Sequence, residues 1–279
     1  MSDLYAVFGN PIAHSQSPQI HAAFAEQCAQ SLRYTAILAP FDGLAGAIAG
    51  FIAAGGRGAN VTVPFKEEAY RLATRLSARA RIAGAVNTLT FNAGDIVGDN
   101  TDGEGLWRDL SRNLGLSLAG QRILLLGAGG AARGVVAPLL ERAPERLTIA
   151  NRTPAKAQRL AELFAAGGAV SGVAYADLAG QRFDLVINAT AASLAGELPP
   201  LPAGIFAADS LAYDMMYGRG ETPFLAFARQ NGAARGSDGL GMLVEQAAES
   251  FRLWRGVRPS TQELIDRLRA AGTPTANGE

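Results

Sequence analysis

The sequence predicts an α/β fold with two domains, and two observations lead to this prediction. Short apolar runs typical of strands alternate with longer segments typical of helices along most of the 279 residues, which is the pattern of parallel sheets covered by helices. A chain of this length also exceeds one ordinary small domain, and its strand–helix pattern starts afresh at about Arg122. We therefore expect an N-terminal α/β domain followed by a second one.

The first half of the chain is expected to hold five strands and four helices. Strands are assigned to short apolar or β-branched runs, and helices to longer runs that a cap, a glycine or a proline introduces. Residues 92–94, Asn-Ala-Gly, favour a turn and predict a hairpin between the last two strands. The run 44–54 is too short to span a bilayer, and its glycine and alanine content favours a buried helix. The expected strands are 4–8, 34–38, 58–63, 86–91 and 95–98, and the expected helices are 18–30, 43–54, 66–75 and 103–113.

The second half repeats the alternation, so a second sheet covered by helices is expected. The polar residues after 272 are expected to fray. The expected strands are 123–126, 147–150, 185–188 and 206–210, and the expected helices are 131–142, 154–164, 222–230, 241–256 and 260–271.

The composition excludes several classes of protein. Lys and Arg number 25, as do Asp and Glu, so the chain lacks the net field that gathers nucleic acid or an anionic membrane. Hydrophobic residues make up 48% of the chain, which excludes disorder as its main state. One cysteine and two histidines exclude an internal disulfide and argue against a metal site. No targeting segment or membrane span shows, so a cytoplasmic protein without nucleic-acid or membrane partners is expected.

A glycine-rich turn between a strand and a helix is the strongest local signal. Residues 123–134 read Ile-Leu-Leu-Leu-Gly-Ala-Gly-Gly-Ala-Ala-Arg-Gly, in which Gly127, Gly129 and Ala132 fit G-x-G-x-x-G/A. The glycines permit the tight turn and the approach of a pyrophosphate, and the helix start offers N–H groups to phosphates. The motif predicts a doubly wound, Rossmann-type dinucleotide-binding domain, with a purely structural turn as the alternative. The expected cofactor-binding residues here are Gly127, Ala128, Gly129, Gly130 and Ala131.

The end of the next strand favours NADP over NAD. An NAD site places Asp or Glu roughly 20 residues after the glycines, but Asn151, Arg152 and Thr153 stand here without a carboxylate. Arg152 offers a planar, permanently charged group to a 2′-phosphate, and Lys156 adds a second cation. Thr153 also reads as a helix cap before Pro154, so an ordinary capped helix start is the alternative.

Two serines before the first helix form one candidate substrate contact. Ser15 and Ser17 offer two hydroxyls at a helix N-terminus, an arrangement that suits a carboxylate. Plain capping by Ser17 is the alternative, and it leaves Ser15 without a role. His14 and His21 are interpreted as scaffold residues, since nothing nearby completes a metal set.

Three further polar clusters stand at strand–helix junctions. Lys66 opens a helix, where a cation opposes the helix dipole, and such a broken local rule hints at function. The other two clusters are Gly84-Ala-Val-Asn87-Thr88 and Asn100-Thr101-Asp102-Gly103. Asp102 also reads as the cap of the next helix, which is an ordinary role for Asp.

Taken together, these clusters resemble the motifs of shikimate dehydrogenase, the NADP-dependent enzyme family of aromatic amino-acid and chorismate biosynthesis. The resemblance covers the chain from Gly9 to about Gly256. The matching segments stand in the family's order and are Ser15-Gln16-Ser17, Asn60-Val-Thr62-Val-Pro-Phe-Lys66, 84–88, 100–103, 151–153, Tyr213-Asp214-Met-Met-Tyr217 and 238–247.

The resemblance implies an oxidoreductase that reversibly reduces 3-dehydroshikimate to shikimate with NADPH and without a metal. It makes Lys66 the general acid of reduction and the base of oxidation, with Asp102 orienting it. The implied substrate-binding residues are Ser15, Ser17, Thr62, Asn87, Tyr217 and Gln246. The implied cofactor-binding residues outside the glycine turn are Asn151, Arg152, Thr153, Lys156, Met215, Gly239 and Met242.

It also implies a discontinuous substrate domain, 1–102 plus 239–279, and a nucleotide domain at 103–238, with a cleft between them. The partners are then small molecules, and the protein is a monomer or a homodimer. Three positions depart from the family pattern: 191–193 lack an expected Ser and Gly, Gly218-Arg219 replaces Asn-Pro, and Ala22 follows His21 where Asn is frequent. These departures leave Lys66 and Asp102 untouched.

Three rival readings remain at the level of sequence. The nearest is a paralogue that prefers quinate or accepts NAD, against which Ser17 and Arg152 argue. Another is a two-domain nicotinamide enzyme such as a methylene-tetrahydrofolate dehydrogenase, which lacks the S-x-S and N-T-D-G motifs. The third is a non-catalytic NADPH-binding regulator, against which the intact Lys66 and Asp102 argue.

Overall fold

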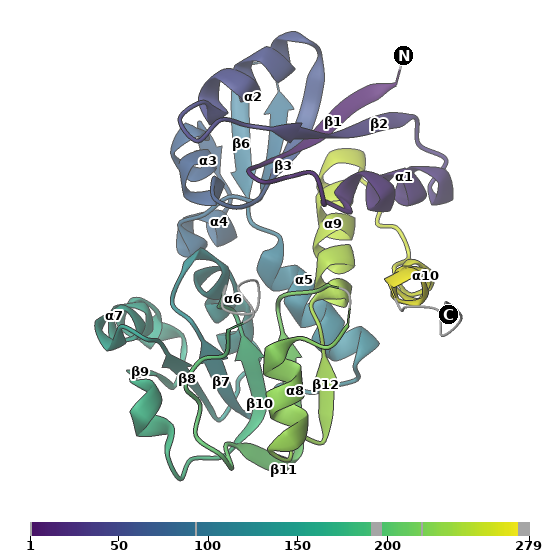
Figure 1. Cartoon of the computed structure of the whole chain (residues 1–279). Coiled ribbons are helices and arrows are strands. Elements are labelled where there is room, and N and C mark those ends of the chain that lie inside the picture. Colours follow the sequence, from purple (N-terminus) through teal and green to yellow (C-terminus); the bar gives the residue numbers. More distant parts are fainter. Residues whose placement is uncertain (1, 93, 191–196, 219, 273–279) are drawn as a thin grey trace. The chain divides into compact units, whose positions relative to one another are not determined.

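The structure is a computed structural model that describes residues 2–92, 94–190, 197–218 and 220–272 (Figure 1). The chain forms two compact units, and each is described by itself. Unit 1 comprises residues 1–106 and 244–264, and unit 2 comprises residues 107–243 and 265–279. The domain limits expected from the sequence, 102/103 and 238/239, stay a prediction.

Unit 1 is built on a mixed sheet with the strand order β2-β1-β3-β5-β6-β4. The first three strands are parallel, whereas β5 runs antiparallel to both β3 and β6. The hairpin expected around residues 92–94 therefore forms, and it makes the sheet mixed rather than parallel. Residue 93 itself lies outside the described residues. The strands are β1 Asp3–Gly9, β2 Leu32–Leu38, β3 Gly56–Val61, β4 Arg75–Leu76, β5 Thr88–Asn92 and β6 Asp95–Asp99.

Apolar side chains on both faces of this sheet are covered by helices. Phe8, Val61 and Leu89 lie in one buried cluster with Leu44 and Ile48 of α2. These are the only residues of α2 classed as buried, so the prediction of a buried helix at 44–54 is wrong. Leu44 and Ile48 lie one turn apart on the side of α2 that faces the sheet, whereas Ile52 and most of the small residues are exposed. The helices within unit 1 are α1 Ser17–Gln27, α2 Leu44–Ala53, α3 Lys66–Leu72 and α4 Ala78–Ala83.

The segment 244–264 joins unit 1 from far along the chain. It carries most of α9, Leu240–Arg255. The indole of Trp254 stacks on Tyr5 with ring centroids 4.7 Å apart and donates to the backbone oxygen of Leu89 at 3.0 Å. A side chain at Gly58 would approach the Trp254 nitrogen to 2.6 Å, so a glycine there makes room for the ring. Burial of aromatic rings on the sheet thus holds this segment in unit 1.

Unit 2 is built on a parallel sheet with the strand order β12-β11-β10-β7-β8-β9. This is the doubly wound order, and the chain reverses its direction of travel across the sheet between β7 and β10, where such folds bind nucleotides. The buried residues Leu124, Leu126 and Val186 form its core with Phe183 and Phe224. The strands are β7 Arg122–Leu126, β8 Arg146–Ala150, β9 Val170–Val173, β10 Phe183–Asn188, β11 Phe206–Asp214 and β12 Arg235–Ser237.

The helices of unit 2 follow the sequence pattern closely. The helix expected at 154–164 is α7, Pro154–Phe164. The one expected at 103–113 is divided, because α5 ends at Arg108 and a π-helical turn follows at Asp109–Asn113. The remaining helices are α5 Asp102–Arg108, α6 Gly130–Leu140, α8 Pro223–Gln230 and α10 Gln262–Gly272, of which α5 and α10 cross a limit between the units.

Across the described ranges, no helix has both the length and the apolar character that crossing a membrane requires.

Candidate active site

Lys66 and Asp102 form a close ion pair inside unit 1. The Lys66 Nζ atom lies 2.6 Å from Asp102 Oδ2, with side-chain exposed fractions of 23% and 7%. Lys66 is the first residue of α3, and Glu67 and Glu68 share the first turn and offset the unfavourable charge at the helix start. Asp102 is the first residue of α5. Two helix starts thus bring an ammonium and a carboxylate together where part of the lysine remains accessible to a ligand.

Asn87 and Gln246 complete a polar group around this pair. Asn87 precedes β5, and its side-chain amide donates to Asp102 Oδ1 at 2.8 Å and to Gln246 Oε1 at 3.3 Å. Asp102 therefore accepts from Lys66 on one oxygen and from Asn87 on the other. Gln246 arrives on α9, 144 positions beyond Asp102 in the numbering. Four residues that the sequence assigns to the site thus lie within one hydrogen-bonded group.

Ser15, Ser17 and Thr62 also belong to unit 1, but no direct hydrogen bond from them to Lys66 or Asp102 is found among the described residues. The alternative of plain capping by Ser17 is wrong, because α1 begins at Ser17 and Gln16 occupies the N-cap position. The backbone N–H of Ser17 instead donates to Ser15 Oγ at 3.3 Å. Thr62 directly follows β3, and a side chain at Gly9 would come within 2.6 Å of the Thr62 methyl group. Gly9 thus leaves space for Thr62 beside the end of β1.

Sequence reasoning missed several buried polar residues next to this group. Asn60, Thr88 and Thr101 are buried and stand inside recognised motifs, so the motifs were a signal for them. Ser250 is also buried, but it belongs to none of the sequence motifs. It reaches this group only because it lies one helical turn, four residues, after Gln246 on α9. Its hydroxyl donates to the backbone oxygen of Gln246 at 3.0 Å and lies 2.8 Å from that of Thr88.

The glycine turn of unit 2 has the backbone that a pyrophosphate site requires. Gly127 directly follows β7 and has φ +106, a conformation that favours glycine, and a side chain there would lie 3.2 Å from the Ala189 oxygen. Gly129 is the N-cap of α6, and side chains added at Gly129 or Gly130 would meet open space. No acidic residue stands in the first turn of α6. The open space beside the glycines and the absence of negative charge in the first turn of α6 fit a bound diphosphate.

The residues after β8 present cations at the surface. Arg152, Thr153 and Lys156 are exposed, and the Asn151 side chain donates to the backbone oxygen of Thr153 at 3.0 Å. Thr153 is the N-cap of α7, as expected, but its side chain makes no capping hydrogen bond. Burial raises the pKa of Tyr175, and the nearby charge of Arg152 opposes this effect. Arg152 is therefore an exposed cation whose charge reaches Tyr175, which fits a 2′-phosphate.

The residues expected beside the nicotinamide follow β11 and open α9. The backbone N–H of Gly239 donates to the Met216 oxygen at 3.0 Å, and a side chain at Gly239 would collide with the Met215 carbonyl. Met242 is 7% exposed, and Tyr217 is half-buried, with its pKa raised by burial. A glycine is therefore required at position 239 for the backbone there to pack against the backbone of Met215.

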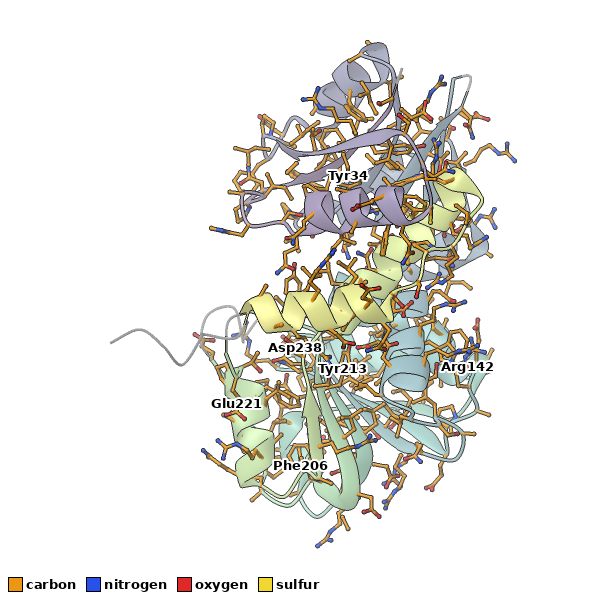
Figure 2. All side chains as sticks on the ribbon, turned by 90° about the vertical axis from the view of Figure 1, so that its right-hand side faces the viewer. Tyr34, Arg142, Phe206, Tyr213, Glu221 and Asp238 are labelled. Atoms are coloured by element: carbon orange, nitrogen blue, oxygen red, sulfur yellow. The ribbon has the colours of Figure 1, made fainter. Side chains whose placement is uncertain are left out.

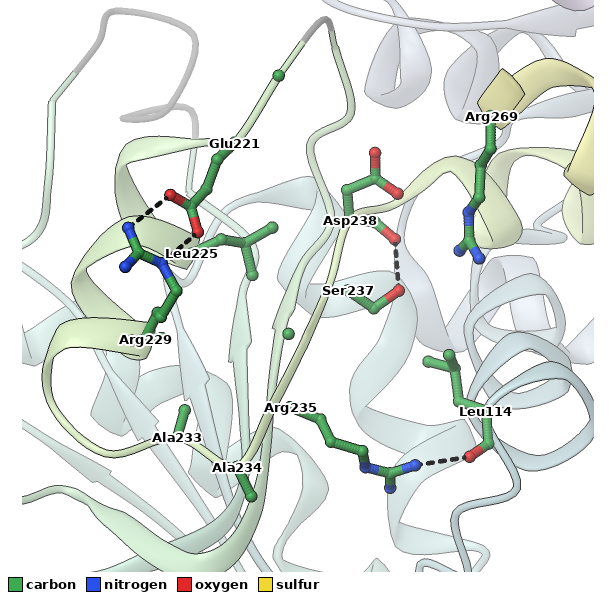
Figure 3. Close-up of a pocket in the computed structure, with 13 residues that line it drawn as sticks. Leu114, Glu221, Leu225, Arg229, Ala233, Ala234, Arg235, Ser237, Asp238 and Arg269 are labelled. Atoms are coloured by element: carbon green, nitrogen blue, oxygen red, sulfur yellow. Dashed lines mark hydrogen bonds and ion pairs between the residues drawn. The ribbon is translucent and has the colours of Figure 1, made fainter. Parts of the chain in front are cut away.

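A cavity of about 480 Å³ lies in unit 2 beside β12 (Figure 3). Glu221 pairs with Arg229 at 3.0 Å, and Arg235 donates to the Leu114 oxygen at 3.1 Å. Asp238 lines it too, and burial raises its pKa. Among the described lining residues, none belongs to the expected catalytic, substrate or cofactor set. The cavity therefore shares no lining residue with the expected site, and Asp238, which lines it, directly precedes Gly239.

Two of the family departures, 191–193 and Arg219, lie outside the described residues. Within the residues that are described, no group of three or more His, Cys, Asp or Glu side chains could hold a metal ion.

Comparison with known proteins covers almost the whole chain. The model of the shikimate dehydrogenase substrate-binding domain matches residues 7–89, that of shikimate/quinate 5-dehydrogenase matches 109–195, and that of the shikimate 5′-dehydrogenase C-terminal domain matches 239–269.

Curated relatives and solved structures agree with these matches. The chain is 67% identical to the shikimate dehydrogenase (NADP(+)) of Dechloromonas aromatica over 97% of this chain and 98% of that protein. It is 65% identical to the enzyme of the same name from Nitrosospira multiformis, over 98% and 100%. It resembles the Thermus thermophilus shikimate 5-dehydrogenase, solved in complex with NADP(H) and shikimate, with 36% identity and a TM-score of 0.85 over 96% and 99%. It also resembles an Ael1 enzyme from Pseudomonas putida, with 51% identity and a TM-score of 0.89 over 96% and 98%.

Proposed function

The chain belongs to the shikimate dehydrogenase family, and from that premise we propose how its residues divide the work of the reaction. The reaction is the reversible, NADP-dependent reduction of 3-dehydroshikimate to shikimate. Each turnover moves a hydride to or from a ring carbon and a proton to or from its oxygen. The protein must therefore hold a sugar-like ring acid, hold a dinucleotide and provide a proton.

One observation carries the assignment of the proton. Lys66 Nζ and Asp102 Oδ2 lie 2.6 Å apart, while Asn87 occupies the other carboxylate oxygen. We assign the proton of reduction to the Lys66 ammonium, which becomes the base of oxidation. Asp102 fixes the direction of the lysine and accepts from a substrate hydroxyl. General acid–base catalysis of this kind contributes about 10²–10⁴-fold in rate.

The remaining polar residues of the set bind the substrate. Ser15 and Ser17 lie at the start of α1, where hydroxyls and helix N–H groups favour a carboxylate, and Tyr217 adds a third hydroxyl to it. Asn87 and Gln246 offer amide groups to ring hydroxyls, and Thr62 faces the same ligand. Holding both reactants in place supplies part of the rate enhancement.

The cofactor residues lie in unit 2. NADP, when bound, supplies the nicotinamide carbon that accepts or donates the hydride. The glycine turn from Gly127 to Ala131 holds its diphosphate, and the segment from Asn151 to Lys156 holds the 2′-phosphate with two cations. Met215, Gly239 and Met242 line the nicotinamide.

Substitution of the lysine tests the assignment. Lys66→Ala is expected to lower kcat for shikimate oxidation by roughly 10³-fold, because the proton acceptor is lost, and to change KM for shikimate by less than about fivefold. Lys156→Ala is the matched control, because it removes a lysine assigned to the cofactor and is expected to raise KM for NADP⁺ with kcat nearly unchanged. A Lys66→Ala enzyme with unchanged kcat and a raised KM would assign the residue to binding instead.

A quinate- or NAD-using paralogue is the alternative function, and steady-state rates with four pairs of substrate and cofactor decide it. The absence of a carboxylate near Arg152 predicts the highest kcat/KM for shikimate with NADP⁺. A higher value for quinate or for NAD⁺ would support the paralogue.

A cytoplasmic location and a monomeric or homodimeric state complete the proposal. Light scattering of the purified protein measures its mass against the 29.0 kDa of one chain, and cell fractionation measures its location.

A further inference from the structure

Asn60, Thr88 and Thr101 stand inside the sequence motifs of the site, yet the proposed mechanism gives them no role. Their exposed fractions are 6%, 0% and 0%. Burial of a polar side chain costs free energy unless the group finds hydrogen-bond partners. The partners of these three residues therefore indicate what they do.

Their hydrogen bonds form one chain through unit 1 that ends at the catalytic pair. The Tyr34 hydroxyl, on β2 (Figure 2), donates to Asn60 Oδ1 at 2.7 Å, and Asn60 Nδ2 donates to Thr88 Oγ1 at 3.1 Å. Thr88 Oγ1 donates to Asn87 Oδ1 at 2.8 Å, and Asn87 Nδ2 donates to Asp102 Oδ1 at 2.8 Å. Every donor in this chain points toward the carboxylate.

Two backbone groups fix that direction. The N–H of Thr101, which can only donate, contacts the Asn87 side chain at 2.9 Å and identifies the contacted atom as the oxygen. The backbone carbonyl of Asn87, which can only accept, contacts the Asn60 side chain at 3.0 Å and identifies that atom as the amide nitrogen. Between the two oriented amides, the Thr88 hydroxyl can accept from Asn60 and donate to Asn87 Oδ1. The Ser250 hydroxyl is a second partner for both, at 2.8 Å from Thr88 Oγ1 and 3.0 Å from Asn60 Nδ2.

We propose that Thr88, supported by Asn60 and Tyr34, is a positioning residue of the dehydrogenase reaction. The inference rests on the proposed function, because Asn87 and Asp102 matter only as parts of that site. In this account Thr88 and the backbone N–H of Thr101 together hold the Asn87 amide by its oxygen, so that the amide nitrogen stays against Asp102 and keeps the carboxylate directed at the lysine. Bonds aligned in one direction polarise one another, which strengthens the last bond of the chain.

Removal of the Thr88 hydroxyl at constant shape is the test. Thr88→Val is expected to lower kcat for shikimate oxidation roughly tenfold, the effect of losing one buried hydrogen bond, while KM for NADP⁺ changes by less than about twofold. Thr88→Ser, which returns the hydroxyl, is expected to recover kcat to within about threefold of the unsubstituted enzyme. Thr90→Val is the matched control, because Thr90 lies two residues along β5 on the same face and outside the chain.

A second substitution tests whether Thr88 acts through Asn87. In an Asn87→Ala background, Thr88→Val is expected to change kcat by less than about twofold, because the group that it positions is gone. An equal loss in both backgrounds, a Thr88→Ser enzyme as slow as Thr88→Val, or an unchanged Thr88→Val enzyme would each overturn the inference.

Tyr34→Phe keeps the inference testable if Thr88→Val does not fold. It removes only the hydroxyl at the far end of the chain and is expected to lower kcat by about threefold at unchanged KM for NADP⁺; unchanged kcat would overturn the inference in that case.

Lys66→Ala separates the failure of this inference from the failure of the proposed function. If Lys66→Ala is inactive and the chain variants match the unsubstituted enzyme, only the positioning role fails, whereas an active Lys66→Ala enzyme contradicts the proposed function.

Discussion

At the scale of single residues, His21 shows how a titratable group serves only as packing. The imidazole is 1% exposed and stacks on Tyr34 with ring centroids 4.2 Å apart and an interplanar angle of 5°. Neither ring nitrogen has a hydrogen-bond partner in the part of the chain that the structure describes. Burial lowers the pKa of His21 from 6.5 to about 3, so the folded protein keeps the ring neutral. The interpretation of His21 as a scaffold residue agrees with these contacts.

The stability of the protein should therefore depend on His21 below neutral pH. Between pH 6.5 and pH 3 the unfolded chain binds a proton that the folded protein excludes, so the free energy of unfolding falls as the pH falls. From pH 7 to pH 5 the loss due to this residue is about 2 kcal/mol. In urea titrations at both pH values, His21→Phe, which retains a stacked ring, should reduce the loss by that amount. Equal losses in both proteins would contradict the role given to burial.

The contact between Lys66 and Asp102 was predictable at this scale, and the residues behind it were not. Lys66 and Asp102 stand in motifs whose spacing is specific, and the structure brings them to 2.6 Å. The cap role of Ser17 failed because the helix starts one residue earlier than a serine cap requires, a difference that sequence does not determine. Ser250 could not be found, because its contact with Thr88 spans 162 positions and depends on how α9 packs.

At the scale of elements, ion pairs hold α9 and the segment after it in unit 1. Glu249 is 3% exposed and contacts Arg79 at 3.2 Å, Arg252 at 2.8 Å and Arg258 at 2.8 Å. Burial alone raises the pKa of Glu249, but the hydrogen bond from Arg252 and the charge of Arg79 outweigh it and hold the pKa below its ordinary value. One carboxylate thus joins α9 both to the residues around α4 and to the chain beyond α9.

Glu249→Ala should destabilise the protein by about 2 kcal/mol, because Arg252 loses its hydrogen-bonded carboxylate, whereas Arg79 keeps Asp99 and Arg258 keeps Glu245. Glu263→Ala, which removes an exposed glutamate of α10, is the control and should change stability by less than about 0.5 kcal/mol. Chemical unfolding of both variants measures the difference. Similar stabilities for the two would show that the buried cluster does not anchor α9.

Long elements with a clear period were predictable, and short ones were not. The strand at 123–126 and the helix at 154–164 follow their apolar patterns almost to the residue. The strands β4 and β12, with two and three residues, are too short to show a period, and their strand character comes from pairing with β6 and β11. Strand β9 contains Gly172, where any side chain would collide with the backbone of α7, so a residue that weakens the strand pattern is required by packing.

At the scale of the whole molecule, the two sheets illustrate a limit of pattern reading. The alternation of strands and helices led to the doubly wound sheet of unit 2, whose strands are all parallel. In unit 1 the hairpin of β5 and β6 was expected, but its antiparallel pairing with β3 follows only from the three-dimensional arrangement. The assignment of 244–264 to unit 1 likewise depends on long-range packing of rings such as Trp254.

Deletion of residues 240–279 should therefore damage the two units unequally. Unit 1 loses Phe251, Trp254 and Glu249, which pack on or pair with its sheet and helices, whereas every strand of the unit 2 sheet remains. Limited proteolysis with mass spectrometry should find cleavage concentrated in 1–106, at least roughly tenfold faster than in the full chain. Uniform cleavage of both units, or protection of 1–106, would contradict the contribution assigned to α9.

The split of unit 1 along the chain also bears on how the protein is made. A ribosome releases residues 1–106 first, then the whole of the six-stranded parallel sheet, and only afterwards the helix that carries Phe251 and Trp254. During synthesis the nucleotide-binding sheet can close before the unit that precedes it has its missing helix. Residues 1–106 are thus translated before the unit 2 sheet, but their fold is completed after it, once residues 244–264 have been made.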